Sequence, residues 1–219
     1  MFASIENESD IRIREVRFFL EFIKNLEDKR KFVISDDLRI MKGLFFVHLY
    51  SVVEFTIVNS VISLLQKIRE DKYSINQFKP GILSIVLDSE CRSLADSGFK
   101  KVWERRWILF DKIFSSDEAV ISDTIIPTDG MNFKYPQLAS IQRSLCMIDP
   151  IIPENRLIGR LEELAENRNA VAHGRKSPVD IGSRYTVVEL EQRFNDINLL
   201  CSHLITVFKT HYVKKSFLK

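Results

Sequence analysis

A segment that runs from Ser35 to about Glu70 without a proline constrains the fold of this chain more than any other feature. Its only glycine is Gly43, and apolar residues fill much of its length. Ser35 followed by Asp36 and Asp37 gives a helix start signal, because acidic side chains in the first turn suit the helix dipole. The pattern predicts one helix, long for a globular protein, with a bend at Gly43.

The apolar part of this segment, Leu44 to Leu65, is long enough to be mistaken for a membrane span. It carries His48, Glu54 and Asn59, and a charged side chain in the middle of a bilayer is costly. The acidic residues near the N-terminus do not fit the basic-then-apolar layout of a secretory signal. We therefore expect a helix buried in protein, and a soluble, cytoplasmic chain with no membrane partner.

The composition also favours helices. The 219 residues include 16 Phe but only 7 Gly and 6 Pro, so turn-forming residues are scarce. The formal net charge of +2 excludes a histone-like binder of nucleic acid, although a local basic patch remains compatible with it. Cys91, Cys146 and Cys201 lie far apart with no CxxC spacing. They indicate neither a disulfide scaffold nor a zinc site, which fits a reducing cytoplasm.

The sequence predicts an all-α helical bundle of five to seven helices in a single domain, residues 1–219, with an irregular insertion around residues 115–136. Ser9 is the expected N-cap of a first helix that ends near Arg30. Thr186 and Glu189 form a capping box that opens the last helix, which continues to about Tyr212. The other predicted helices cover residues 82–95, 99–114, 137–147 and 154–173, and residues 175–185 are expected to form an ordered loop.

The helix expected over residues 154–173 carries the feature of most chemical interest. One apolar stripe on it is formed by Leu157, Leu161, Leu164 and Val171. Arg168 falls in the middle of that stripe, where another Leu would be expected. A cation in a core-facing row is costly unless it is paired or lines a wet cleft. Periodicity leaves three alternatives open: a functional residue, a partner of a buried carboxylate such as Glu54, or a side chain that reaches solvent at a frayed helix end.

Asn169 and His173 are four residues apart, so their side chains share one helix face and can touch. Arg168 and His173 are five apart, roughly 140° around the helix, so a single helix does not aim both at one point. Two copies related by a two-fold axis could do so, which predicts a homodimer with a composite site. A lone His at a helix end is usually a C-terminal cap. Its conjunction with Arg168 and Asn169 is what indicates a site.

The run Arg168-Asn169-x-x-x-His173 is similar to the RX4–6H signature of the HEPN superfamily of all-helical ribonucleases, including the polar residue directly after the Arg. Further stretches resemble a prokaryotic HEPN branch often linked to toxin–antitoxin or phage-defence loci. These stretches are Leu49-Tyr50-x-x-Val53-Glu54 with Asn59, then residues 167–174, Ser177-Pro178 and Tyr185-Thr186. The resemblance thus covers residues 44–65 and 154–212.

This resemblance implies a metal-independent endoribonuclease, without cofactor, that cleaves RNA through the 2′-OH. Carried over position by position, it implies Arg168 and His173 as catalytic residues and Asn169 as a polar assistant. Glu54 matches a frequently acidic position of the family on the long helix. HEPN toxins silenced by nucleotidylation carry a Tyr where this chain has Arg175, which argues against control by that route. A cognate antitoxin or a defence partner protein is a further expectation.

Other basic and aromatic residues add to these expectations. Around the motif, Arg175, Lys176 and Arg184 provide a positive field for RNA phosphates and are the expected RNA-binding residues. Trp103 and Trp107 flank two arginines, which can mean stacking on nucleotides, but their helical spacing favours a core position for both. His203 and His211 are expected in solvent.

Three functions compete at this point. The first is the HEPN-type endoribonuclease, as a toxin or a phage-defence effector. The second is a non-catalytic HEPN-like module that binds RNA, a nucleotide or a partner protein. The third is a structural helical bundle in which Arg168 is neutralised inside the core.

Overall fold

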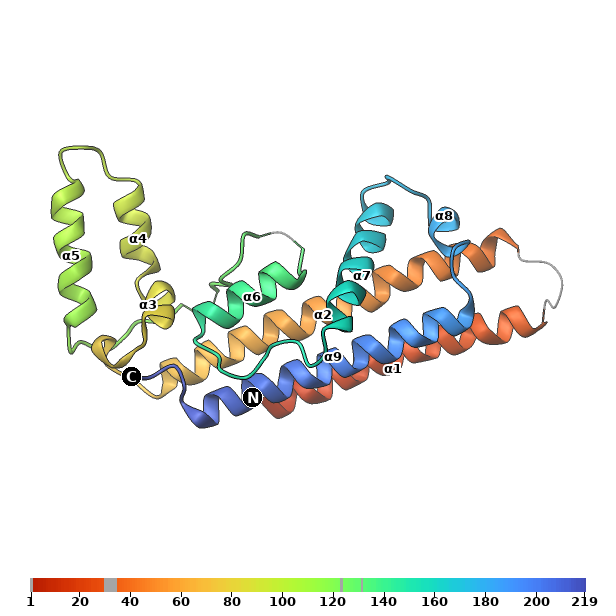
Figure 1. Ribbon diagram of the computed structural model, residues 1–219, viewed down its shortest axis with the longest axis horizontal. Helices are drawn as coiled ribbons and strands as arrows, with labels where there is room; N and C mark the ends of the chain where they lie inside the picture. The colour runs from red at the N-terminus through yellow and green to blue at the C-terminus, as the bar shows by residue number, and fades with distance from the viewer. Residues whose placement is uncertain (1, 30–34, 123, 131) are drawn as a thin grey trace. The chain divides into compact units, whose positions relative to one another are not determined.

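The computed structural model describes residues 2–29, 35–122, 124–130 and 132–219. Within these ranges it contains nine α-helices, one short 3-10 helix and no β-strand (Figure 1). The all-α class predicted from the sequence is confirmed. In chain order the elements are α1 (Phe2–Lys29), α2 (Asp36–Glu70), η1 (Ile75–Gln77), α3 (Pro80–Val86), α4 (Asp88–Ala95), α5 (Val102–Phe114), α6 (Tyr135–Ser144), α7 (Arg156–Ala172), α8 (Pro178–Gly182) and α9 (Val187–Lys214).

The helices form two compact units. Unit 1 comprises residues 1–59, 132–135 and 152–206, and unit 2 comprises residues 60–131, 136–151 and 207–219. The long helices α2 and α9 each contribute one part to unit 1 and the other part to unit 2.

Unit 1 is a bundle of α1, the first part of α2, α7, the short α8 and most of α9. Each long helix turns an apolar face to the others, and these faces are fully buried at Val16, Phe45, Leu161 and Ile197. Removing such side chains from water supplies about 1.5–3 kcal/mol each, which is the main favourable term in forming the bundle.

Ser9 is not the helix cap that the sequence predicted. Since α1 already begins at Phe2, Ser9 lies inside the helix, where it is buried. Its hydroxyl shares a hydrogen bond of 3.1 Å with the hydroxyl of Thr56 in α2. Phe2 and Ile5 are also buried, so tertiary packing stabilises turns that local propensity alone did not predict. The predicted end of this helix, near Arg30, lies outside the described residues.

The helix α2 is continuous from Asp36 to Glu70, as predicted. It is also long and apolar enough to cross a membrane by length and composition, and 56% of its most apolar window is buried inside the protein. Core helices of globular proteins meet the same test. Gly43 permits a close approach inside this helix: a Cβ atom there would lie 2.1 Å from the backbone oxygen of Pro178 in α8.

Unit 2 contains the end of α2, α3 to α6 and the end of α9, with a core that includes Phe78, Ile141 and Phe208. His211 belongs to this core, so the prediction of a solvated side chain is wrong. Burial lowers the pKa of His211 below its usual range. The His211 ring lies 5.7 Å from the ring of Phe217. Phe217 follows the end of α9, so this contact depends on the turn that the chain makes after that helix.

The described residues form nine α-helices, more than the five to seven predicted, for two local reasons. The predicted helix over residues 82–95 is divided at Leu87, whose backbone leaves helical angles (φ −102°, ψ 22°) while its side chain is buried. Residues 175–185 contain α8, which Ser177 caps by accepting a hydrogen bond of 3.1 Å from the Asp180 backbone N–H. Pro178 at the first position completes a start signal. The described residues between α5 and α6 contain no helix, as the predicted irregular insertion requires.

The α4–α5 hairpin in unit 2 has no buried residue in either helix. Trp103 is 66% exposed and Trp107 is 67% exposed, so the predicted core position of both side chains is wrong. Periodicity identifies an apolar face, but it does not say whether the chain itself covers that face.

We predict that Gly43→Ala destabilises the protein by about 1–3 kcal/mol, because the added methyl group forces α2 away from α8. Gly159→Ala is the matched control, since nothing lies within 4 Å of a Cβ atom at that exposed position in α7. It should raise stability by about 0.5–1 kcal/mol through helix propensity. Urea denaturation measures both. Equal effects of the two substitutions would contradict the close-approach role of Gly43.

Candidate functional site

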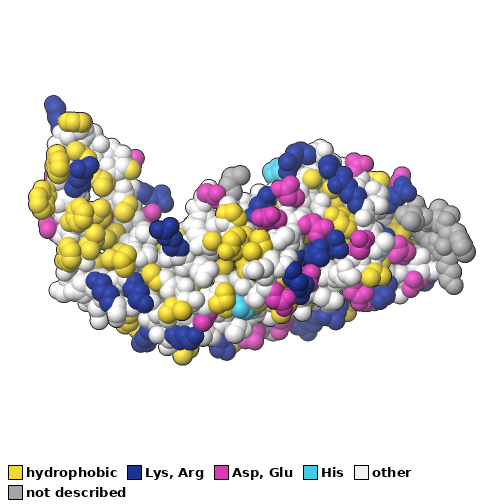
Figure 2. Space-filling model, in the orientation of Figure 1, with side chains coloured by type: hydrophobic (Ala, Val, Ile, Leu, Met, Phe, Trp, Pro, Cys, Tyr) yellow, Lys and Arg dark blue, Asp and Glu magenta, His cyan; other side chains and the backbone are white. Residues whose placement is uncertain are grey.

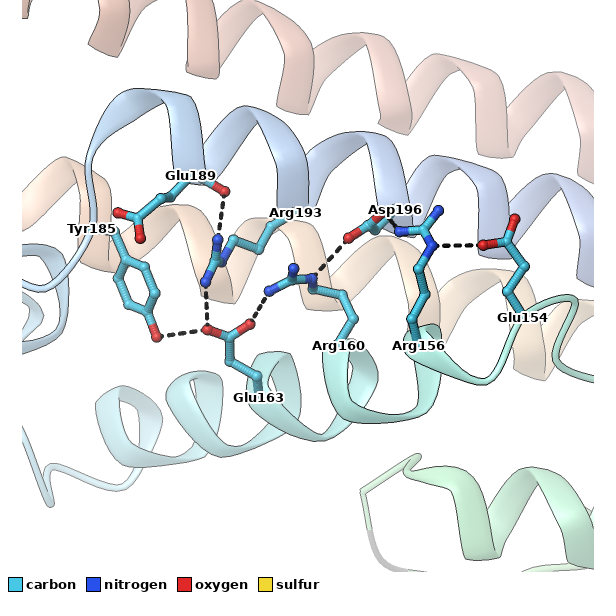
Figure 3. Close-up of polar contacts among 8 residues, drawn as sticks. All are labelled: Glu154, Arg156, Arg160, Glu163, Tyr185, Glu189, Arg193 and Asp196. Atoms are coloured by element: carbon cyan, nitrogen blue, oxygen red, sulfur yellow. Dashed lines mark hydrogen bonds and ion pairs between the residues drawn. The ribbon is translucent and has the colours of Figure 1, made fainter.

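A network of charged side chains joins α7 to α9 (Figure 3). Arg156, Arg160 and Glu163 are spaced along one face of α7, and Arg193 and Asp196 face them from α9. Asp196 accepts hydrogen bonds from Arg156 and, at 2.9 Å, from Arg160. Alternating signs on facing helices let each charge meet an opposite partner, so the network fixes the register of α7 against α9.

Glu163 is the centre of this network. It pairs with Arg160 and accepts hydrogen bonds from Arg193 at 2.9 Å and from the hydroxyl of Tyr185 at 3.0 Å. Burial by itself would raise the pKa of Glu163, but the donors on Arg193, Arg160 and Tyr185 outweigh it and hold the pKa below its ordinary value. The carboxylate is therefore charged at neutral pH.

Tyr185 extends the network to the motif. Its hydroxyl accepts a hydrogen bond of 2.9 Å from the side-chain amide of Asn167, the residue before Arg168. Its ring packs against Phe46 of α2 at a centroid distance of 4.7 Å. The segment that follows α8 is thus tied to α2 and to the last turns of α7.

Arg168 lies in a partly open setting. Its side chain is 25% exposed, and one guanidinium nitrogen donates to the side-chain oxygens of Asn132 at 2.8 Å and Asn169 at 2.9 Å. The carboxylate of Glu54 is 3.7 Å away and is itself 47% exposed. Arg168 thus has the carboxylate partner that one sequence alternative named, but this carboxylate is half-exposed and not buried as expected. The arginine side chain also reaches solvent, as another alternative predicted. The pairing is weak, since a half-exposed carboxylate at this distance is well solvated.

Tyr50 of α2 lies beneath this arginine. The guanidinium carbon of Arg168 is 5.0 Å from the centroid of the Tyr50 ring, a cation–π distance. The Tyr50 hydroxyl accepts a hydrogen bond of 2.7 Å from the backbone N–H of Phe133. Desolvation raises the pKa of Tyr50 to about 12, so the hydroxyl stays neutral. Tyr50 thereby fixes the segment that carries Asn132.

His173 ends α7. Its backbone N–H bonds to the backbone oxygen of Asn169 at 3.1 Å, and Gly174 then turns the chain with φ 66°. The side chain is exposed. Among the residues that the structure describes, its imidazole makes no hydrogen bond or ion pair, either with Arg168 or with another side chain. Within one chain the structure thus shows no interaction between the two predicted catalytic side chains.

The three basic residues predicted to bind RNA share a pocket of about 340 Å³ in unit 1. Arg175, Lys176 and Arg184 line one part of it, and all three are exposed. The other lining residues are Glu163, Glu166, Asn167, Ala170, Ile181 and Tyr185. The pocket therefore lies beside the last turns of α7, and the Glu163 network forms part of its wall.

Metal ligation was not expected from the sequence. Across residues 2–29, 35–122, 124–130 and 132–219, no three His, Cys, Asp or Glu side chains come together as metal ligands would.

Sequence reasoning missed Asn132, Tyr50 and Glu163 as parts of the site. A signal existed for Glu163, because opposite charges recur at spacings of three and four residues on both α7 and α9. None existed for Asn132, which comes from the irregular insertion and reaches Arg168 only through the tertiary fold.

A family model described as MAE_28990-like HEPN matches residues 1–217. The chain belongs to this HEPN family. The match confirms the resemblance found in the sequence, and it extends that resemblance over the stretch between residues 71 and 147 that no motif had covered. This chain matches no curated protein and no solved structure.

We predict that Glu163→Gln lowers the free energy of unfolding by about 2–3 kcal/mol, because it leaves Arg193 without a counter-charge in a partly buried setting and leaves Arg160 with Asp196 alone. Glu162→Gln, at an exposed neighbouring position, is the matched control and should be neutral. Thermal and urea denaturation at pH 7 measure both.

The same variant has a pH signature. The pKa of Glu163 is lowered in the folded protein, so its contribution to stability is present above its unfolded value of about 4.5 and is lost as the pH falls through the folded value. Wild-type stability should therefore fall more steeply on acidification than that of Glu163→Gln. Parallel profiles would show that Glu163 is not the anchor of α7.

Proposed function

We propose that this HEPN protein is a metal-independent endoribonuclease that cleaves RNA through its 2′-OH at a composite site in a homodimer. The observation that carries the proposal is the environment of the Arg168 side chain. Arg168 is oriented by two neutral amide oxygens, it has only a distant and solvated carboxylate partner, and a quarter of its side chain is open to solvent. A guanidinium held in this way keeps most of its positive charge available to a phosphate.

The chemistry follows from these groups. The 2′-oxygen of RNA forms a bond to the adjacent phosphorus, and the bond from phosphorus to the 5′-oxygen breaks. The 2′-OH loses a proton and the leaving 5′-oxygen gains one. His173 has an exposed imidazole, the side chain that most often accepts and donates protons in enzymes at neutral pH. Arg168 stabilises the charge on the phosphate oxygens. Asn169 and Glu54 position the Arg168 side chain.

A composite site reconciles the separation of Arg168 and His173 within one chain. Two copies of α7 related by a two-fold axis can place the arginine of one protomer beside the histidine of its partner. The pocket lined by Arg175, Lys176 and Arg184 then gives RNA phosphates a basic path next to the end of α7. We propose RNA as the substrate, and a toxin or defence role with a cognate antitoxin or defence partner protein as regulator.

One observation favours the non-catalytic alternative. Arg168 joins α2, α7 and the Asn132 segment through its partners, so it also has a structural role. The two functions differ in what the loss of the side chain does. A structural residue affects stability first, and a catalytic residue affects cleavage first.

We predict that Arg168→Ala and His173→Ala are folded but inactive on RNA. Arg168→Ala should lose only about 1–2 kcal/mol of stability, because its two amide partners can turn to water. The control is His203→Ala, which changes a histidine of α9 outside the motif and should retain activity. A badly destabilised Arg168→Ala together with a fully active His173→Ala would favour the structural alternative.

A mixing experiment tests the composite site. Neither inactive variant can cleave RNA as a homodimer, but a mixed dimer contains one site with both Arg168 and His173 intact. After equal amounts are mixed and exchanged, activity should recover to about a quarter of wild type. Activity that stays absent, with mixed dimers demonstrated by mass spectrometry, would place both residues in one protomer's site.

We also predict the product ends. Cleavage should leave a 2′,3′-cyclic phosphate and a 5′-hydroxyl, and it should continue in excess EDTA, because the nucleophile is supplied by the RNA itself. An RNA with a 2′-deoxy sugar at the scissile position should not be cut. Labelling of the ends with kinase and phosphatase distinguishes the outcomes: 5′-phosphate ends, or loss of cleavage in EDTA, would rule out this mechanism.

A further inference from the structure

The α4–α5 hairpin of unit 2 exposes a large aromatic surface that has no role in the proposed ribonuclease site. The hairpin contains no buried residue in either helix, and Figure 2 shows hydrophobic side chains gathered over it, at the left of the view. The exposed aromatic residues and their exposed fractions are Phe99 98%, Trp103 66%, Trp107 67%, Phe110 55% and Phe114 76%. Contiguous apolar surface of this kind marks an interaction site.

Four of these aromatic residues form one stripe along α5. Trp103, Trp107, Phe110 and Phe114 follow each other at spacings of four, three and four residues. This is the spacing of the apolar seam of a coiled coil, in which one helix packs lengthwise on another. A groove of about 500 Å³ runs beside the stripe, lined by Leu94 of α4 and by residues of α5 that include Trp103 and Phe110. The stripe therefore fits a helix as its partner.

The charged side chains beside the stripe indicate which helix the partner is. Arg106 and Asp111 lie on opposite flanks of it, about 140° apart around α5. Arg106 lies next to the stripe, with its guanidinium carbon 4.8 Å from the Trp103 ring. Neither side chain has an ion-pair partner within the described part of the chain. They are five residues apart, which is the offset at which flanking charges pair between two parallel helices of a coiled coil. A second α5 would thus complement the first one.

We propose that α5 binds α5 of a second copy of this chain, in parallel and about a two-fold axis, with the aromatic stripes in contact and Arg106 of each copy paired with Asp111 of the other. The area supports a stable interface. At ~200 Å² for each aromatic side chain, the exposed fractions of the four stripe residues give roughly 530 Å² per copy, or about 1,050 Å² for the two copies together. A specific interface buries at least about 1,000 Å² in total.

The same surface fits RNA or a membrane less well. Two carboxylates, Glu104 and Asp111, border the stripe against one cation, Arg106, so the surface offers no net positive charge to RNA phosphates or anionic lipid headgroups. The interface is also independent of the proposed ribonuclease dimer, because α5 belongs to unit 2 and α7 to unit 1. Two different self-interfaces in one chain would build assemblies larger than a dimer.

The first test compares Trp107→Glu with Ile148→Glu. Both side chains are similarly exposed in unit 2, at 67% and 70%, but only Trp107 belongs to the stripe. Multi-angle light scattering of the full chain should show the mass of Trp107→Glu reduced at least twofold from wild type at tens of micromolar, with Ile148→Glu unchanged. Circular dichroism confirms that both are folded.

The masses also separate this proposal from the ribonuclease dimer. If both interfaces exist, wild type is larger than a dimer and Trp107→Glu is a dimer; if only the α5 interface exists, Trp107→Glu is a monomer. Either result supports the α5 proposal. A mass unaffected by Trp107→Glu overturns it. Binding of a single-stranded RNA or of phosphatidylserine vesicles that Trp107→Glu abolishes, with unchanged mass, would assign the stripe to that ligand instead.

The second test exchanges the flanking charges. Arg106→Glu and Asp111→Arg should each weaken self-association by about tenfold, because each creates like-charged pairs at the interface. The double variant restores opposite charges between copies and should recover most of the wild-type affinity. Analytical ultracentrifugation over a concentration series gives the dissociation constants. A double variant that is no better than the single ones would overturn the parallel pairing.

Discussion

The carboxylate of Glu163 is the contact on which the candidate site depends. This partly buried charge pairs with Arg160 of its own helix. It also accepts hydrogen bonds from Arg193 of α9 and from the hydroxyl of Tyr185. Tyr185 in turn holds Asn167, which directly precedes Arg168. Because an anion in this position is stable only with all of its donors in place, the end of α7 has little freedom to shift. The motif is positioned by a network that contains no motif residue.

Arg168 shows how the fold keeps a cation in an apolar helix stripe without neutralising it. Three features share the cost of its desolvation: two amide oxygens, the face of the Tyr50 ring, and partial contact with solvent. A fully buried partner would have stabilised the charge more, but it would also have competed with a phosphate. His173 has the opposite environment, exposed and without a side-chain partner in the described residues, which is compatible with the proton transfer proposed for it.

The two units differ in how completely they bury their apolar surface. Unit 1 buries the apolar faces of four helices against one another and carries the motif, the network and the basic pocket. Unit 2 has a core of its own around Phe78 and Phe208, yet its α4–α5 hairpin leaves an aromatic stripe uncovered. A chain that keeps such a stripe in water forgoes a large hydrophobic gain, which a second copy would recover.

The sequence by itself determined the helical class, the extent of α2, the capping box of α9 and the family, because these follow from local propensity, spacing and a contiguous motif. It also singled out Arg168 as out of place. It did not determine which apolar faces are covered, so Trp103, Trp107 and His211 were assigned to the wrong environments. It named Glu54 as one possible partner of Arg168, but it did not identify Asn132 or Tyr50 as partners. Those partners are distant along the chain, and only the tertiary fold, in which burial is decided by every helix at once, sets their distances.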